Sequence, residues 1–256
     1  MNGSGALALD AHFPPNVGAA VTTRDLDGGH SAPPFDRFNL GTRCGDAPEA
    51  VAANRALLIE RLRLPSAPRW LKQVHGSAVA TFDGSAAAAA EPAADAAFTR
   101  SANVVLAILT ADCLPILIAA DDGSEIAAVH AGWRGLAGGV IEAAASHFGV
   151  ARSRLSAWIG PGIGASSYEV GAEVRAAFVD GDAGAAGAFS ATRAGHWLCD
   201  LAALARRRLQ AEGVARIGGG GFDTYADARF YSYRRDGRTG RFASLIWIAD
   251  LTPDSR

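Results

Sequence analysis

The side chains best suited to chemistry gather in one short segment of this sequence, from Thr110 to Gly139. Its apolar runs have the composition of buried strands, and the reactive side chains stand at the ends of those runs. A strand end holds a side chain rigidly while its neighbours still reach solvent, so α/β-type folds often place their chemistry there. The reactive residues of this segment are Asp112, Cys113, His130, Trp133 and Arg134. We therefore expect the functional site to be built around it.

A cysteine and a histidine at strand ends are compatible with three kinds of site. Cys113 and His130 can be a thiolate nucleophile and its base, or two ligands of a transition metal. They can also be a buried thiol and a core histidine without a chemical role. Residue types alone leave all three open.

The elements around this pair predict that the two side chains come close together. Asn103 to Thr110 has the aliphatic, β-branched composition of a strand buried on both faces. A second run, Ile116 to Ala120, is followed by the turn signal Asp-Asp-Gly, so Glu125 to Val129 is expected to return as its hairpin partner. In such a hairpin, Cys113 and His130 lie near one edge of the sheet.

A third candidate ligand is His75, which precedes a glycine within the short apolar segment Arg69 to Val79. Catalytic zinc typically takes three protein ligands and keeps one position open. Spacing cannot show whether His75 reaches the pair, and a lone histidine before glycine is usually a turn residue. The next segment, Ser85 to Ala97, is rich in alanine and is interpreted as a surface connection without function.

Two further segments carry candidate binding residues. Asp25 to Cys44 is rich in glycine, proline and aspartate and predicts a long loop, which is uncommon in a compact domain unless it has a function. Near the C-terminus, aromatic hydroxyls beside arginines would suit an anionic or heteroaromatic ligand. Solvated loop residues and a charged edge strand are the alternative interpretations. The candidates are Arg24, at the end of the strand before the loop, Asn39 and Arg43 within the loop, and Tyr233 and Arg234 near the C-terminus.

The rest of the chain predicts a mixture of helices and strands. Apolar spacing and composition indicate helices over 48–64, 138–148, 168–178 and 198–212, and strands over 17–23, 155–159 and 243–249. The glycine run at 218–221 is expected to be flexible.

Composition limits the classes of protein that fit. The chain has 256 residues, 49% of them hydrophobic, and a formal net charge of −2, so it suits one large globular domain or two small ones and does not favour nucleic acid or membrane as a partner. No apolar run reaches the roughly 18 residues of a spanning helix, and the N-terminus lacks a signal-peptide layout. Three widely spaced cysteines do not make a disulfide framework, which favours the cytoplasm.

Several motifs resemble the YfiH/PgeF-type family, also named multicopper polyphenol oxidoreductase or laccase-domain proteins and described as purine nucleoside phosphorylases. The matching segments span nearly the whole chain in order. They are VTTR at 21–24, FNLGTRCGD at 38–46, LKQVHG at 71–76, TADCLPILI at 110–118, AVHAGWRGLAGG at 128–139, IGPGIGASSYEVG at 159–171 and FYSYRRDGRTGRFASLIWI at 230–248.

The resemblance implies an α+β fold: a single α/β/β layered domain over residues 1–256, with a loosely ordered N-terminus over 1–15. The fold type is related to cytotoxic-necrotizing-factor-like cysteine hydrolases. The resemblance also implies that His75, Cys113 and His130 converge on one zinc ion, in preference to copper.

This chain departs from the family pattern at two positions. Family members often have cysteines where it has Gly162 and Asp223. Neither position belongs to the three implied ligands, so the departure weakens only a copper or redox role.

The implied activity is zinc-dependent phosphorolysis of adenosine, inosine, guanosine and methylthioadenosine, with adenosine deamination as a further activity. The expected partners are purine nucleosides and phosphate, and the expected state is a cytoplasmic monomer or small homo-oligomer. The catalytic candidates are His75, Asp112, Cys113 and His130, and the substrate-binding candidates are Arg24, Asn39, Arg43, Trp133, Arg134, Tyr233 and Arg234.

Two of these candidates carry specific hypotheses. Because an arginine fork binds phosphate bidentately, Arg24 is expected to hold phosphate. Asp112 is expected to orient a ligand or move a proton, with capping of local backbone as the alternative.

Other functions use the same residues differently. A metal-free Cys113/His130 hydrolase or amidase is the main rival. The family resemblance also implies, as one such activity, the editing of peptidoglycan precursors that carry a nucleotide-linked amino sugar. A copper-dependent polyphenol oxidase would need many histidine ligands, and only two of the six histidines, His75 and His130, stand in matching motifs. A non-enzymatic interaction protein is disfavoured, since no repeat or large apolar stripe is evident.

Overall fold

The computed structural model describes residues 6–7, 9–84 and 90–250, and its longer strands form two large sheets. The four-stranded sheet has the order β1 (Ala6–Leu7), β2 (Val17–Thr22), β13 (Phe242–Ile248), β5 (Val105–Thr110). The six-stranded sheet has the order β12 (Arg216–Gly219), β8 (Leu155–Ile159), β6 (Leu114–Ala120), β7 (Ile126–Ala131), β4 (Ala96–Thr99), β3 (Val79–Phe82).

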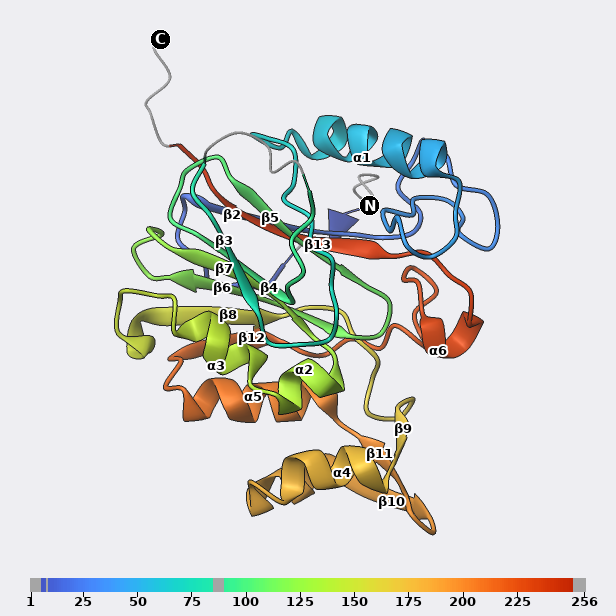
Figure 1. Cartoon of the computed structure of the whole chain (residues 1–256), viewed down its shortest axis with the longest axis vertical. Helices are drawn as coiled ribbons and strands as arrows, with labels where there is room; N and C mark the ends of the chain where they lie inside the picture. The colour runs from blue at the N-terminus through green and yellow to red at the C-terminus, as the bar shows by residue number, and fades with distance from the viewer. Residues whose placement is uncertain (1–5, 8, 85–89, 251–256) are drawn as a thin grey trace.

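The remaining elements comprise a small sheet and short to medium helices. The small sheet has the order β10 (Phe189–Arg193), β11 (His196–Cys199), β9 (Glu169–Gly171), and with α4 it forms a lobe that projects from the body (Figure 1). The α-helices in the described ranges are α1 (Pro48–Leu62), α2 (Trp133–Ala137), α3 (Val140–Ala145), α4 (Ala172–Val179), α5 (Leu201–Ala211) and α6 (Tyr233–Asp236). None of them is long and apolar enough to cross a membrane.

The two large sheets pack face to face, and helices cover both outer sides (Figure 1). Helix α1 lies on the four-stranded sheet, while α2, α3 and α5 lie on the six-stranded one. Along β5, Leu106 and Ile108 face the other sheet, whereas Val105 and Ala107 face α1. Alternate side chains of a strand point to opposite faces, so a strand between two apolar layers has an uninterrupted apolar sequence. The expected α+β architecture is confirmed, with helices on both outer sides.

The predicted hairpin is present and directs the reactive residues to one end of the six-stranded sheet. Strands β6 and β7 are antiparallel, with Pro115 opposite His130. The turn includes Gly123, whose φ of +69° lies in the left-handed region that glycine adopts readily. The connection from β5 to β6 therefore brings Cys113 next to the end of β7.

Three of the predicted elements differ from the structure. The helix expected over 138–148 is shorter: Gly139, where φ is +85°, separates α3 from the preceding α2, and α3 runs only from Val140 to Ala145. The helix expected over 168–178 begins as the strand β9, because residues 169–171 pair with β11. The glycine run expected to be flexible is partly ordered, since β12 pairs in parallel with β8 as far as Gly219. In each case a backbone turn or a partner strand outweighs local composition.

The prediction of a surface connection over 85–97 is wrong for its second half, while residues 85–89 lie outside the described residues. Asp95, Ala96 and Ala97 are fully buried, and β4 is an interior strand between β3 and β7. The small side chains of Ala96 and Ala97 allow tight packing on both faces of this interior strand.

The expected loose N-terminus is only partly testable, because residues 1–5 and 8 lie outside the described residues. The other residues of this segment are attached to the fold. Strand β1 pairs with β2, and Asp10 accepts a hydrogen bond of 2.6 Å from the indole of Trp158.

Candidate metal centre and its cavity

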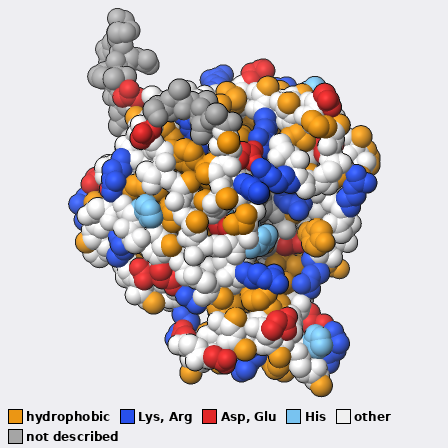
Figure 2. All heavy atoms as spheres, viewed as in Figure 1, with side chains coloured by type: hydrophobic (Ala, Val, Ile, Leu, Met, Phe, Trp, Pro, Cys, Tyr) orange, Lys and Arg blue, Asp and Glu red, His pale blue; other side chains and the backbone are white. Residues whose placement is uncertain are grey.

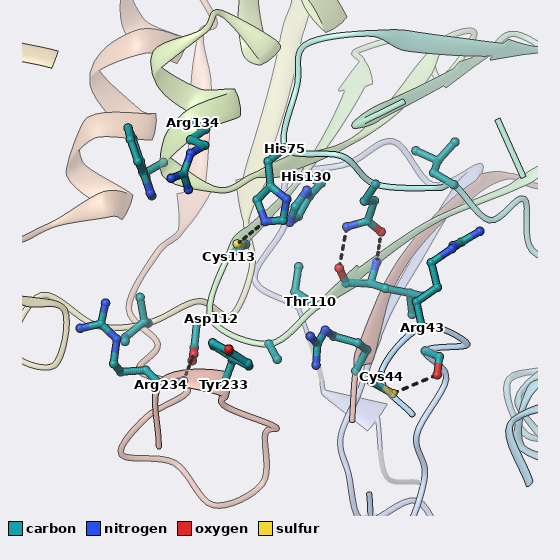
Figure 3. Close-up of a pocket in the computed structure, with 18 of the residues that line it drawn as sticks. Arg43, Cys44, His75, Thr110, Asp112, Cys113, His130, Arg134, Tyr233 and Arg234 are labelled. Carbon is teal, nitrogen blue, oxygen red and sulfur yellow. Dashed lines mark hydrogen bonds between the residues drawn. The ribbon is translucent and has the colours of Figure 1, made fainter. Parts of the chain in front are cut away.

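Three side chains from separate parts of the chain converge in the structure. His75 comes from the loop before β3, Cys113 from the β5–β6 connection and His130 from β7 (Figure 3). Their candidate ligand atoms all lie within 4.8 Å of one another, and Cys113 Sγ is 3.8 Å from His75 Nε2. These three residues, called the triad below, can hold one metal ion.

The backbone around the triad is shaped for close approach. His75 has a φ of +61°, which is uncommon for a residue with a side chain. Gly132 stands where a Cβ would lie 2.9 Å from Cys113 Sγ and 2.9 Å from His75 Cδ2. Only glycine leaves room there for a cysteine and a histidine to face each other.

A buried carboxylate, Asp95, contacts both histidines of the triad. Its Oδ1 accepts hydrogen bonds from His130 Nδ1 at 2.8 Å and from the backbone N–H of His75 at 2.9 Å. Sequence analysis missed this residue, since it lies in the segment interpreted as a surface connection. Its position directly before a strand, as an acidic residue among alanines, was the only available signal.

The triad is polarised even without a metal. Burial alone would raise the pKa of the Cys113 thiol, but the charge and hydrogen bond of His130, with help from His75, lower it to about 6. Burial alone would lower the pKa of His130, but the Cys113 thiolate and Asp95 raise it to about 9. Between those values the metal-free site contains a thiolate beside an imidazolium.

The triad borders a cavity of about 530 Å³. Lys and Arg side chains gather on two sides of a hollow in the molecular surface there, as Figure 2 shows. The cavity is lined by aromatic and basic side chains from several elements: Arg43, Trp133, Arg134, Tyr168, Tyr233, Arg234 and Arg241.

Five of the seven substrate-binding candidates therefore line the cavity. The guanidinium of Arg134 stacks on Trp133, 4.3 Å from its ring centroid. Tyr233 is largely exposed, and Arg234 donates to the Glu169 carbonyl at 2.9 Å. Arg43 is paired with Glu91 at 2.6 Å, and its side chain points away from the triad (Figure 3).

The other two candidates lie outside the cavity lining. Arg24 pairs with Asp36 at 3.2 Å and lies 5.0 Å from the ring centroid of Tyr231. Asn39 is fully buried, and its amide oxygen accepts from the backbone N–H groups of Gly41 and Arg241. Both make contacts that shape loops, and neither is brought into the cavity lining with the other candidates.

Two of the aromatic and basic side chains of the lining were missed by sequence analysis. Tyr168 precedes β9, and Arg241 packs against the Gly41 backbone and donates to the carbonyls of Thr239 and Gly240. Both stand inside motifs that carry the family resemblance. Only the tertiary structure shows which residues of those motifs line the cavity.

Asp112 lies next to Cys113 and has a φ of +91°. Its carboxylate accepts hydrogen bonds from the Thr224 hydroxyl and the backbone N–H of Arg234, both at 2.7 Å, and its carbonyl accepts from Ile163. This residue therefore connects the Cys113 loop to the Thr224 loop and to two segments of the cavity wall, the turn at Ile163 and the helix α6.

The two positions that depart from the family pattern are neighbours. The Gly162 carbonyl accepts from the Thr224 N–H at 2.9 Å, directly after Asp223. Asp223 accepts from Gly164 and Ser167, so its carboxylate closes the glycine-rich turn. Neither residue belongs to the triad.

Fold and site together define a layered α+β protein with a Cys–His₂ cluster that could hold a metal ion at a sheet end. The chain belongs to the YfiH family, whose model is described as "Multi-copper polyphenol oxidoreductase laccase" and matches residues 18–249.

Similar proteins cover nearly the whole chain. A "Purine nucleoside phosphorylase" of Xylella fastidiosa strain Temecula1 is 52% identical, over 96% of this chain and 97% of its own length. "Purine nucleoside phosphorylase YfiH" of Escherichia coli K12 is 46% identical, over 92% and 96%. The crystal structure of Neisseria meningitidis NMB0706 is 42% identical with a TM-score of 0.90, over 96% of this chain and all of that one.

Proposed function

We propose that this protein is a zinc-dependent purine nucleoside phosphorylase that uses phosphate to cleave adenosine, inosine, guanosine and methylthioadenosine. The observation that carries the proposal is the position of the triad, at a cavity bordered by arginines and aromatic rings. The printed names of the Xylella and Escherichia relatives support it.

Zinc is the metal whose preferred ligands fit the triad. One thiolate and two imidazoles are a common zinc ligand set, and a zinc-binding histidine usually donates its other ring N–H to a carboxylate or carbonyl, as His130 does to Asp95. Three protein ligands leave a position open, where bound zinc supplies Lewis-acid polarisation of a substrate oxygen or of water.

Phosphate binding is assigned to Arg134 and Arg234 in place of Arg24. Both guanidinium groups line the cavity together with Tyr168, and that of Arg234 lies 5.1 Å from the Tyr168 ring centroid. No ion pair with a carboxylate involves either of them among the described residues. Their planar N–H donors match phosphate oxygens.

The purine base is assigned to the aromatic part of the wall. Trp133 and Tyr233 line the cavity, and flat aromatic faces stack well on a heterocycle. Asp112 is assigned a positioning role, because both of its carboxylate oxygens are already hydrogen bonded within the protein.

The test is mass-spectrometric analysis of products from adenosine and inosine, with and without phosphate. We expect free base and ribose 1-phosphate only when phosphate is present. Conversion of adenosine to inosine would add deamination as a further activity. If zinc-containing protein releases no base under any of these conditions, the phosphorylase proposal is wrong.

A metal-free hydrolase or amidase is the second candidate, favoured by one observation. Asp95, His130 and Cys113 form a carboxylate–imidazole–thiol series in which the thiol pKa is lowered to about 6. Such a series is how cysteine hydrolases activate their nucleophile, which fits the proposed relation of this fold to cysteine hydrolases. Its candidate substrates are nucleotide-linked amino-sugar precursors of peptidoglycan.

Alkylation distinguishes the two candidates. If the metal-free protein is active and labelling of Cys113 abolishes that activity, the hydrolase is supported. If activity appears only when zinc is added, the phosphorylase is supported.

A multicopper oxidase is disfavoured because it needs many histidine ligands. The single three-ligand cluster among the described residues contains only two histidines.

We also propose that the protein works in the cytoplasm as a monomer or small homo-oligomer. All three cysteines are free thiols, as a reducing compartment favours.

A further inference from the structure

Asp95 is surrounded by hydrogen-bond donors. Its Oδ1 accepts from His130 Nδ1 and from the His75 N–H, as described above. Its Oδ2 accepts from the N–H of Val74 at 3.1 Å and from the N–H of Gly76 at 2.7 Å. Each carboxylate oxygen therefore holds two donors, and the side chain is fully buried.

This arrangement links the two histidines of the triad through one side chain. The bond to His130 uses Nδ1, so Nε2 is the nitrogen that remains for the triad. The three bonds to residues 74–76 hold consecutive N–H groups around His75, whose left-handed backbone is disfavoured for a residue with a side chain. The hydrogen bond to Nδ1 orients the His130 ring, and the three hydrogen bonds from backbone N–H groups hold the loop that carries the His75 ring.

We propose that Asp95 is a positioning residue that holds His75 and His130 in the geometry of the metal centre before any metal binds. This inference rests on the proposed metal binding by the triad, and it does not depend on which substrate is used. Cys113 completes the set from the β5–β6 connection, and its Sγ lies 3.8 Å from His75 Nε2.

The chemistry of the four donors makes asparagine the informative replacement. A carboxylate is acceptor-only, whereas an amide has one acceptor oxygen and an NH₂ group. In Asp95→Asn, either orientation of the amide sets its NH₂ group against two N–H donors: those of Val74 and Gly76, or those of His75 and His130. The size of the side chain is unchanged, so no cavity is created.

The test measures metal binding by the purified metal-free protein, without nucleoside. Zinc affinity is obtained by competition with a chelator, and cobalt(II) is added separately to record the thiolate-to-cobalt and d–d absorption bands. For Asp95→Asn we expect zinc affinity to fall about 10- to 100-fold, as is typical when the partner of a metal-bound histidine is removed. The cobalt bands should shift, because the histidines no longer hold the same geometry.

Asp223→Asn is the matched control. Asp223 also accepts backbone N–H groups, from Gly164 and Tyr225, but lies outside the triad. Its replacement should leave zinc affinity and the cobalt bands as in the wild type. A folded Asp95→Asn protein with wild-type zinc affinity and cobalt bands would overturn the inference.

A measurement on the wild type covers the case in which Asp95→Asn does not fold. Proton NMR of the metal-free protein should show a strongly downfield Nδ1–H resonance that disappears in His130→Ala. Absence of that resonance in folded wild-type protein would also overturn the inference. None of these measurements uses nucleoside. Protein that binds metal but releases no base would therefore contradict the phosphorylase proposal and would not affect the inference on Asp95.

Discussion

The carboxylate of Asp112 and the backbone N–H of Arg234 lie 2.7 Å apart and are hydrogen bonded. This bond connects the residue before the proposed zinc ligand Cys113 to α6, which carries Tyr233 and Arg234 into the cavity wall. The proposed substrate residues are thereby connected to the proposed metal centre.

Replacement of Asp112 distinguishes positioning from proton transfer. Asp112→Ala removes two hydrogen bonds to a carboxylate, each contributing about 1.5–3 kcal/mol, so kcat/KM should fall at least about 10-fold. Asp112→Asn can keep both, because its oxygen accepts from Arg234 and its NH₂ can donate to the Thr224 hydroxyl. We expect the Asn variant to retain most of the activity in phosphorolysis assays. Loss of activity equal to that of the Ala variant would instead assign proton transfer to Asp112.

Each member of the triad should be required for zinc. We expect His75→Ala, Cys113→Ala and His130→Ala to lose zinc and activity together, because two ligands do not hold the ion tightly. Zinc content by inductively coupled plasma mass spectrometry is the measurement. Cys199→Ala removes a buried thiol outside the triad and should keep its zinc. Full zinc content in any of the three triad variants would refute the ligand assignment.

Cys113 of the metal-free protein should be alkylated at unusually low pH. The thiolate is the reactive form, and a pKa lowered to about 6 means that the iodoacetamide rate rises through pH 6 and is near its plateau by pH 7 to 8. The buried Cys199, whose pKa is raised to about 12, should stay unlabelled in folded protein. Peptide mass spectrometry identifies the labelled site. A midpoint for Cys113 near 9, the ordinary value, would contradict the thiolate–imidazolium pair.

Gly132→Ala should disturb the triad while preserving the fold. Its backbone is extended, with φ of −68° and ψ of 161°, so alanine is compatible with the conformation. The new Cβ would nevertheless stand 2.9 Å from both Cys113 Sγ and His75 Cδ2, and one of them must move. We expect about tenfold weaker zinc binding by chelator competition. Gly181→Ala, where a Cβ meets nothing within 4 Å, is the control.

The proposed phosphate site predicts a selective kinetic defect. Arg134→Ala and Arg234→Ala each remove a charged donor, a loss of about 1.5–3 kcal/mol, so the KM for phosphate should rise about 10- to 100-fold. The KM for nucleoside should change much less. Arg207→Ala, which removes an exposed arginine paired with Asp182, should leave both constants as in the wild type. An unchanged KM for phosphate in both cavity variants would move the phosphate site elsewhere.

Local sequence determined much of this protein. The hairpin of β6 and β7, the strands β5 and β13 and the helix α1 follow from apolar runs, a turn signal and helical spacing, all of which act over a few residues. They were enough to predict Cys113 and His130 at one sheet edge. The third ligand, 38 residues from Cys113, followed only from the resemblance, because spacing does not encode such a distant contact.

Tertiary structure alone decided which polar residues belong to the site. Arg24 and Asp95 are both charged residues at the ends of short apolar runs. Packing of the sheets buries Asp95 among four hydrogen-bond donors at the proposed metal centre. Arg24 instead contacts Asp36 and Tyr231, outside the cavity. A buried charge is stable only with its partners in place, and those partners come from distant parts of the chain.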